Sequence, residues 1–482
     1  MRALAILAII MSSGTLASCI HSAPSEASDT RSRVESSLMP AVVFAEEEPT
    51  YHTIAERMSR YNVPGLSAAL IHNGEIEWVA GYGVKAAGSS DSVSPATVFQ
   101  AGSIAKPVAA VAAMRMGDAG LIHLDADIQT VLKEYVIPEG EQTPDNPVTF
   151  RNLLSHTAGT TRGGYMGYTR GEPIPTALQV VRGLPPANSP EVTVATSPGE
   201  ELAYSGGGYT IVQIAIEDVT GDAFERALDD WVLSVLGMSQ STYEQALPQE
   251  LEGAAALGHS ADGTLVPGGW RVHPEMAAAG LWSTATDLAS FAIELRKAFR
   301  GEGSLLQHGS AVELLTEQME GHAFGFVLGL HGENPSFSHA GGTVGYRAFM
   351  TMDLHTGNGA VIMTNSDQGM GLARELLRAA SFVYGWEGFK PKVMPRIALG
   401  TDMLAPLEGT YDFGNGVQVT IALQDSAEAL SITFPNGDEY GLVPTAPLSF
   451  VHPDSGVTVD FKGSDESRRV IVYGQVGIRA PL

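Results

Sequence analysis

Hydrophobic and polar positions divide the chain into two regions with different patterns. In the first region, strand-like apolar runs are interleaved with longer helical runs. Gly65 to Ile71 and Glu75 to Val79 are joined through an Asn-Gly dipeptide, which is a strong hairpin signal. An alanine- and valine-rich run, Val108 to Met116, predicts a buried helix, and Arg347 to Met352 with Ala360 to Thr364 predicts a second antiparallel pair. We therefore expect this region to fold as a mixed domain of helices and antiparallel strands.

After Pro391 the pattern changes to short strand-like runs with no helical run between them. Regular short strands separated by turn residues predict a small all-β barrel or sandwich. We place the boundary near residue 395, so that the mixed domain covers residues 51–390 and a small β-barrel domain covers residues 395–482. The short runs are Val417–Leu423, Ala429–Phe434, Tyr440–Val443, Leu448–Val451, Val457–Phe461 and Val470–Tyr473.

Residues 1–18 have the pattern of an export signal. Arg2 supplies a positive start, and Ala3 to Met11 is apolar but too short to span a bilayer. The next segment, Leu-Ala-Ser-Cys ending at Cys19, resembles the lipobox of bacterial lipoproteins, in which the cysteine becomes the lipid-modified N-terminus. The resemblance implies export to the cell envelope or periplasm with a lipid anchor on Cys19, at the outer membrane in a Gram-negative cell because Ile20 replaces aspartate. The alternative is an ordinary signal peptide with an incidental cysteine.

The segment after this signal differs in composition from the folded regions. Residues 19–50 are rich in Ser, Ala, Glu and Pro, so we expect a flexible tether there. Cys19 is the only cysteine, which excludes an intrachain disulfide. A net charge of −26 disfavours nucleic acid as a partner. No other segment is long and apolar enough to span a membrane, so the lipid anchor is the expected membrane contact.

The first candidate for chemistry is Ser103, which stands three residues before Lys106 at the start of the predicted buried helix. Residues at i and i+3 share a helix face, so the lysine amine can lie near the serine hydroxyl. A serine is a weak nucleophile by itself, and a neighbouring amine with a lowered pKa can activate it. No other lysine in the chain has a serine at this spacing. The alternative without catalysis is that Ser103 caps the helix and that Lys106 is a solvated surface lysine.

Two later segments are unusual as well. Tyr204-Ser205-Gly206 is followed by two more glycines and a predicted helix, and taken alone this segment indicates a tight turn. His339-Ala340-Gly341 precedes Gly342 and the second antiparallel pair. His156 lies in a Leu-Leu-Ser-His-Thr-Ala-Gly run, where we expect it to hold local backbone by hydrogen bonds rather than act as a base.

Together, Ser103-x-x-Lys106, Tyr204-Ser205-Gly206 and His339-Ala340-Gly341 resemble, in order and spacing, the motifs of the serine β-lactamase and penicillin-binding-protein superfamily. The closest match is the branch with class C β-lactamases, D-Ala-D-Ala carboxypeptidases and related esterases. The runs at 153–159 and 275–281 also look typical of it, and the resemblance covers residues 50 to 385. It implies an α/β (α+β) fold in which helices flank an antiparallel sheet, and the β tail resembles lipocalin-like C-terminal domains that cover the cleft mouth or mediate assembly.

The resemblance also implies roles for the site residues. Ser103 would be the acylated nucleophile, Lys106 would keep its proton labile, and Tyr204 would share the base role and then protonate the leaving group. The backbone N–H groups of Ser103 and Gly342 would form the oxyanion hole. His339 takes the place of a residue that is usually lysine and would bind a substrate carboxylate only if protonated, and Gly341 would let the substrate lie along the strand.

One departure from the family pattern affects the expected substrate. The second motif usually ends in asparagine, whose amide contacts the acyl amide of the substrate, and here that residue is Gly206. We therefore expect a serine hydrolase with an acyl-enzyme mechanism on small ester or amide substrates, including D-amino acid peptides. The alternatives are a β-lactamase or D-Ala-D-Ala carboxypeptidase proper, and a penicillin-binding-like lipoprotein sensor that does not turn over.

Other classes of chemistry lack their motifs. No serine has the Gly-x-Ser-x-Gly context of an α/β-hydrolase, and the 13 histidines form no His-Glu-x-x-His zinc motif. The three consecutive glycines after Ser205 lack the spacing of a dinucleotide-binding loop. We therefore expect no metal and no cofactor, and a small molecule or peptide as the substrate.

Overall fold

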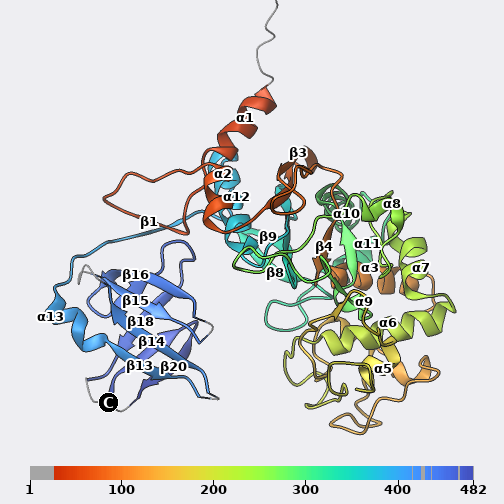
Figure 1. Ribbon diagram of the computed structural model, residues 1–482. Coiled ribbons are helices and arrows are strands. Elements are labelled where there is room, and N and C mark those ends of the chain that lie inside the picture. The colour runs from red at the N-terminus through yellow and green to blue at the C-terminus, as the bar shows by residue number, and fades with distance from the viewer. Residues whose placement is uncertain (1–25, 415, 425–428, 436, 465–466, 481–482) are drawn as a thin grey trace, which may run out of the picture.

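The computed structural model describes residues 26–414, 416–424, 429–435, 437–464 and 467–480. Its centre is a six-stranded sheet in the order β3-β2-β11-β10-β9-β8, and every neighbouring pair is antiparallel (Figure 1). Both hairpins that the sequence predicts therefore lie in one sheet. The strands are β2 (Gly65–His72), β3 (Glu75–Gly83), β8 (Val327–His331), β9 (Asn334–Thr343), β10 (Tyr346–Asp353) and β11 (Gly359–Thr364).

Helices cover both faces of this sheet because its strands bury side chains on both sides. Along β2, Ala69 and Ile71 join the larger core, whereas Ala68 and Leu70 join the smaller one. The larger core contains α3 (Ala105–Asp118), α6 (Gly206–Thr220) and α10 (Ala285–Phe299), and the smaller contains α2 (Ile54–Arg60) and α12 (Gly369–Tyr384). This arrangement confirms the expected antiparallel sheet flanked by helices.

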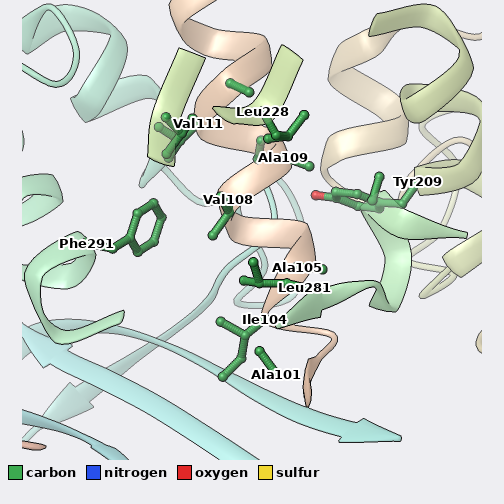
Figure 2. Packing of buried hydrophobic residues seen from close by; sticks show 14 of the residues in the cluster. Ala101, Ile104, Ala105, Val108, Ala109, Val111, Tyr209, Leu228, Leu281 and Phe291 are labelled. Carbon is green, nitrogen blue, oxygen red and sulfur yellow. The ribbon is translucent and has the colours of Figure 1, made fainter. Parts of the chain in front are cut away.

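Helix α3 runs through the middle of the larger core. Its side chains are small and apolar, and Val108, Ala109 and Val111 are fully buried (Figure 2). Tyr209 on α6 and Phe291 on α10 pack around it from different sides. Small side chains allow other helices to approach closely, so the start of α3 is held firmly in the domain.

Shorter elements complete this domain. Strand β4 (Phe99–Gly102) leads into α3 and pairs with β7 (Leu281–Ser283). The remaining short elements are the 3-10 helix η1 (Ile128–Thr130), α4 (Phe150–Leu154), β5 (Tyr168–Thr169), α5 (Ala177–Val181), α7 (Phe224–Leu228), the π-helical turn η2 (Asp229–Leu233), α8 (Gln249–Glu252), β6 (Arg271–Val272), α9 (Met276–Ala279) and α11 (His308–Leu314).

The C-terminal region is a closed barrel of eight strands, as the pattern after Pro391 predicts. Leu430, Leu442 and Phe450 belong to its own core, separate from the two cores of the helical domain. The barrel begins at Gly409, after the short strand β12 (Lys392–Met394) and helix α13 (Thr401–Leu404). Its strands are β13 (Gly409–Asp412), β14 (Gln418–Leu423), β15 (Leu430–Thr433), β16 (Glu439–Ala446), β17 (Ser449–Val451), β18 (Thr458–Lys462), β19 (Arg469–Val472) and β20 (Gln475–Arg479).

The expectation of a flexible tether over residues 19–50 is wrong for its described part. Residues 26–35 form helix α1 (Glu26–Glu35), and β1 (Val42–Phe44) pairs in parallel with β12. Val34 and Leu38 are apolar residues in a segment that is otherwise largely polar, and both are fully buried in the smaller core. The predicted signal peptide and Cys19 lie outside the described residues. Among the helices of residues 26–480 that the structure describes, none combines the length and hydropathy that a bilayer crossing requires.

A buried ion pair joins α2 to α12. Arg57 Nε donates to Glu375 Oε2 at 2.6 Å, the Tyr61 hydroxyl donates to Glu375 Oε1 at 2.7 Å, and the Glu375 side chain is fully buried. The same guanidinium reaches Asp454 of the barrel at 3.3 Å. Arg57 therefore connects α2 both to α12, through Glu375, and to the C-terminal domain, through Asp454.

We predict that Glu375→Ala lowers the free energy of unfolding by about 3 kcal/mol, because it removes the buried carboxylate that pairs with Arg57 and leaves this guanidinium only the more exposed carboxylate of Asp454. The exposed pair of Lys390 and Glu387 offers a matched control, and Glu387→Ala should change stability by less than about 1 kcal/mol. Urea unfolding followed by circular dichroism measures both variants. Equal effects of the two substitutions would contradict a special role for the buried pair.

Candidate active site

The sequence before α3 positions Ser103 at a turn between a strand and a helix. Strand β4 ends at Gly102, whose φ of +54° is unfavourable for residues with a side chain. The Ile104 N–H donates to the Ala101 carbonyl at 3.2 Å, and the Lys106 N–H donates to the Ser103 carbonyl at 3.1 Å. These bonds fix the turn, and they hold a half-buried serine directly before the helix.

Lys106 is buried, with only 1% of its surface exposed. Its Nζ donates to Ser103 Oγ at 3.2 Å and to the carbonyl oxygen of Ala278, on α9, at 2.8 Å. Among the described residues, no carboxylate forms an ion pair with this amine. Lys106 is therefore not the solvated lysine of the alternative interpretation, and its amine is directed at the serine.

Tyr204 meets this pair from a segment a hundred residues away in sequence. Lys106 Nζ lies 4.9 Å from the centroid of the Tyr204 ring. Tyr204 as a whole remains 38% exposed, so the site is accessible to solvent at this residue. Ser205, the next residue, caps α6 by accepting a hydrogen bond from the Gly208 N–H and donating to the Thr161 carbonyl, both at 2.8 Å. The cap fixes the backbone that carries the tyrosine.

His156 also packs against the tyrosine ring, with centroids 4.3 Å apart. The Ser205 N–H donates to its Nδ1 at 3.1 Å, and the Ala203 N–H donates to its backbone carbonyl at 2.8 Å. Burial, and then the positive charge of Lys106, lower the pKa of His156. A neutral ring that accepts at Nδ1 holds the loop of Tyr204 in place, which is the role the sequence predicts for this histidine.

His339 lies on β9 near the same cluster, with its ring centroid 6.3 Å from that of Tyr204. Only 5% of its surface is exposed. Burial, followed by the charge of Lys106, lowers the pKa of His339 to about 3. Its Nδ1 lies 2.6 Å from the Ala340 carbonyl oxygen and therefore carries the proton of the neutral ring. A neutral His339 cannot supply the positive charge that a substrate carboxylate would need.

The two glycines after Ala340 allow β9 to approach β4 very closely. A Cβ atom on Gly341 would lie 1.9 Å from the Ala101 carbonyl oxygen, and one on Gly102 would lie 2.6 Å from the Gly342 nitrogen. The Gly342 backbone N–H thus lies beside the turn that carries Ser103. Strand β8 pairs with β9 only as far as Ser338, which leaves residues 339–343 without a β8 partner.

Gly206 has no side chain to offer, and an aromatic ring fills the adjoining space. A Cβ atom on Gly206 would lie 3.2 Å from Cε2 and 3.4 Å from Cδ2 of Tyr165. The sequence analysis missed Tyr165, because a tyrosine between glycines in an aperiodic loop carries no signal of its own. It also missed the Ala278 carbonyl, since a backbone acceptor is not encoded by residue type.

Behind the site, Gln213 connects α6 with α9. Its Nε2 donates to the Pro274 carbonyl at 3.1 Å, and its Oε1 accepts from the Ala277 N–H at 3.3 Å. Gln213 therefore connects α6, which follows Tyr204, to α9, whose Ala278 carbonyl accepts the hydrogen bond from Lys106. In the part of the chain that the structure describes, no cluster of three His, Cys, Asp or Glu side chains is suited to a metal ion.

Comparison with known proteins agrees with this arrangement. The family model described as Beta-lactamase matches residues 52–384. The chain belongs to the beta-lactamase family. Its similarity to penicillin-binding protein 4 of Amycolatopsis lactamdurans extends over 385 residues at 27% identity, covering 74% of this chain and 95% of that protein.

Solved structures show the same fold at low sequence identity. The octameric penicillin-binding protein homologue from Pyrococcus abyssi has a TM-score of 0.59 at 20% identity, over 88% of this chain and 98% of that one. D-amino acid amidase from Ochrobactrum anthropi SV3, complexed with D-phenylalanine, has a TM-score of 0.58 at 18% identity, over 74% of this chain and 99% of that one. This beta-lactamase family member thus combines the fold of its family with a separate C-terminal barrel.

We predict that Gly102→Ala removes hydrolytic activity, because the added methyl group would push the Gly342 N–H away from the Ser103 turn. Gly120 is the matched control, since its φ is +75° and a Cβ atom there would meet nothing within 4 Å. Gly120→Ala carries the same backbone strain, about 1 kcal/mol, without the steric clash. Steady-state ester hydrolysis together with thermal melting separates the two effects, and equal activity of both variants would contradict the prediction.

The lowered pKa of His339 predicts that its ring stays neutral from pH 5 to pH 9. The unfolded chain takes up a proton at this histidine near its ordinary pKa of 6.5, so the folded state loses stability as the pH falls below that value. Proton NMR of the ring, assigned by comparison with His339→Asn, checks this directly. A midpoint near 6.5 in the folded protein would refute it.

Proposed function

We propose that this protein is a serine hydrolase that forms an acyl-enzyme on Ser103 and acts on small ester or amide substrates, including D-amino acid peptides. The observation that carries the proposal is the distance of 3.2 Å between Lys106 Nζ and Ser103 Oγ in a buried setting. The Tyr204 ring beside the same amine adds the third reactive group. Membership of the beta-lactamase family and the structural likeness to a D-amino acid amidase support it.

In this mechanism the Ser103 hydroxyl attacks the substrate carbonyl carbon, and its proton passes to the Lys106–Tyr204 pair. The N–H groups of Ser103 and Gly342 receive the oxyanion, and donors of this kind contribute about 3 kcal/mol each to the transition state. The phenol of Tyr204 then protonates the leaving alcohol or amine as the bond to the carbonyl carbon breaks. In the second half the pair takes a proton from a water molecule as that water attacks the carbonyl carbon of the ester on Ser103. The bond between this carbon and Ser103 Oγ then breaks, the proton passes from the pair to Oγ, and the acid leaves the restored serine.

The lining of the site favours simple acyl substrates over β-lactams. His339 is neutral and buried, so it offers no positive charge to a β-lactam carboxylate. Gly206 has no amide that could bind an acylamino side chain. Both features weaken recognition of the same class of substrate. A β-lactamase, a D-Ala-D-Ala carboxypeptidase and a sensor without turnover are the other outcomes that the experiment below distinguishes.

We predict that a fluorophosphonate probe and a fluorescent penicillin label the purified full chain at Ser103, and that the chain hydrolyses p-nitrophenyl acetate and butyrate. Ser103→Ala should lose labelling and turnover, whereas Lys106→Ala should lower kcat by about 10²- to 10⁴-fold because the serine keeps its proton. The exposed Lys133 provides the control, and Lys133→Ala should keep wild-type rates.

The outcomes separate the alternatives. Labelling without turnover of esters, D-amino acid amides, muropeptides or cephalosporins identifies a sensor. Efficient turnover of cephalosporins alone identifies a β-lactamase, and release of D-alanine from muropeptides identifies a carboxypeptidase. Absence of labelling, or labelling that persists in Ser103→Ala, overturns the assignment of the nucleophile.

A further inference from the structure

The loop that contains Tyr165 runs along the segment of the catalytic tyrosine. The Gly207 N–H donates to the Arg162 carbonyl at 3.0 Å, and the Ser205 hydroxyl donates to the Thr161 carbonyl at 2.8 Å. A Cβ atom on Gly163 would lie 3.5 Å from the Tyr204 carbonyl oxygen. The backbone of this loop therefore accepts hydrogen bonds from the two residues that flank Gly206, Ser205 and Gly207.

Helix periodicity shows which residues of α6 share a face with Gly206, which is buried. Residues 206, 209, 210 and 213 share one face of α6. On this face Tyr209 has its ring centroid 5.7 Å from Lys106 Nζ, and Gln213 binds the backbone of α9. Gly206 therefore begins the helix face that reaches Lys106 and α9, and the loop of Tyr165 borders this face at the end nearest Tyr204.

Tyr165 covers that position with hydrocarbon. Its ring carbons Cε2 and Cδ2 are 3.2 and 3.4 Å from the place of a Gly206 Cβ atom. Its hydroxyl oxygen is turned to Thr210 Oγ1, 3.3 Å away and one helical turn further along α6. Burial raises the pKa of this hydroxyl, so it stays neutral. The atoms nearest to the Gly206 Cβ position are thus ring carbons of the tyrosine, and the Arg162 carbonyl oxygen, 3.5 Å from it, already accepts from the Gly207 N–H.

We propose that Tyr165 is a specificity-determining residue that favours, among the substrates of the proposed function, those with an unsubstituted apolar acyl chain and disfavours those with an acylamino group at this position, N-acylated D-amino acid peptides included. The inference rests on the proposed function and names its acyl class. An amide brought against the ring loses its hydrogen bonds to water and gains none in return. A hydrocarbon chain of the same length is instead transferred from water to an aromatic surface.

The test compares two p-nitrophenyl esters with the same leaving group and acyl chains of equal length, the pentanoate and the N-acetylglycinate. Two replacements of similar size differ in polarity: Tyr165→Leu keeps an apolar wall, and Tyr165→Gln introduces an amide. The measured quantity is the ratio of kcat/KM for pentanoate to that for N-acetylglycinate. We expect Tyr165→Leu to keep this ratio within about threefold, whereas Tyr165→Gln should lower it at least tenfold, about 1.4 kcal/mol.

Tyr165→Phe adds a control for the hydroxyl, and thermal melting reports on folding of each variant. An unchanged ratio in Tyr165→Gln, or an equal fall in Tyr165→Leu and Tyr165→Gln, would overturn the inference, since the ring would then act only in folding. Ser103→Ala in the wild-type background tests the proposed function separately. If hydrolysis of both esters persists in that variant, the assignment of the nucleophile fails whatever the ratios are.

Discussion

The close approach of β9 to β4 is the constraint on which the arrangement of the site depends. The two strands belong to different sheets and are separated by more than two hundred residues of chain, yet Gly102 and Gly341 let their backbones meet without a side chain between them. Because α3 follows β4 directly, this contact fixes the position of Ser103 relative to the Gly342 N–H. The buried amine of Lys106 then follows from the helix itself, one turn further on.

Much of this could be predicted from the sequence, because the relevant signals are local. The Asn-Gly hairpin, the run of alanine and valine after Ser103, and the short strands after Pro391 each specify an element through its own residues. The three motifs also resemble a known superfamily in order and spacing, which gave the fold and the candidate residues. The structure then brings Ser103, Lys106 and Tyr204 together, and it places His156 as a support for the Tyr204 loop.

The features that the sequence analysis missed are those that depend on distant partners. The composition of residues 19–50 is typical of a tether, but Val34 and Leu38 find apolar partners on β2, β3 and α12 that no local pattern reveals. The same holds for Tyr165, whose meaning comes from the missing side chain of Gly206 in another part of the chain. The neutral state of His339 also arises from burial next to a cation, which its motif position alone does not disclose.

Strand β1, which follows α1 and precedes the rest of the helical domain, pairs in parallel with β12 in the linker that leads to the barrel. The same segment reaches the barrel, since the Val42 N–H donates to the Pro453 carbonyl at 3.0 Å, while the neighbouring residue Asp454 contacts Arg57 and Arg60 of α2. The barrel is therefore fastened by its own linker and also by chain that precedes the hydrolase domain. Tension applied at the N-terminus would load the contacts of α1 with α12 and β3 before it reached the pairing of β1 with β12, so the helical domain would bear a pull from that end before the barrel did.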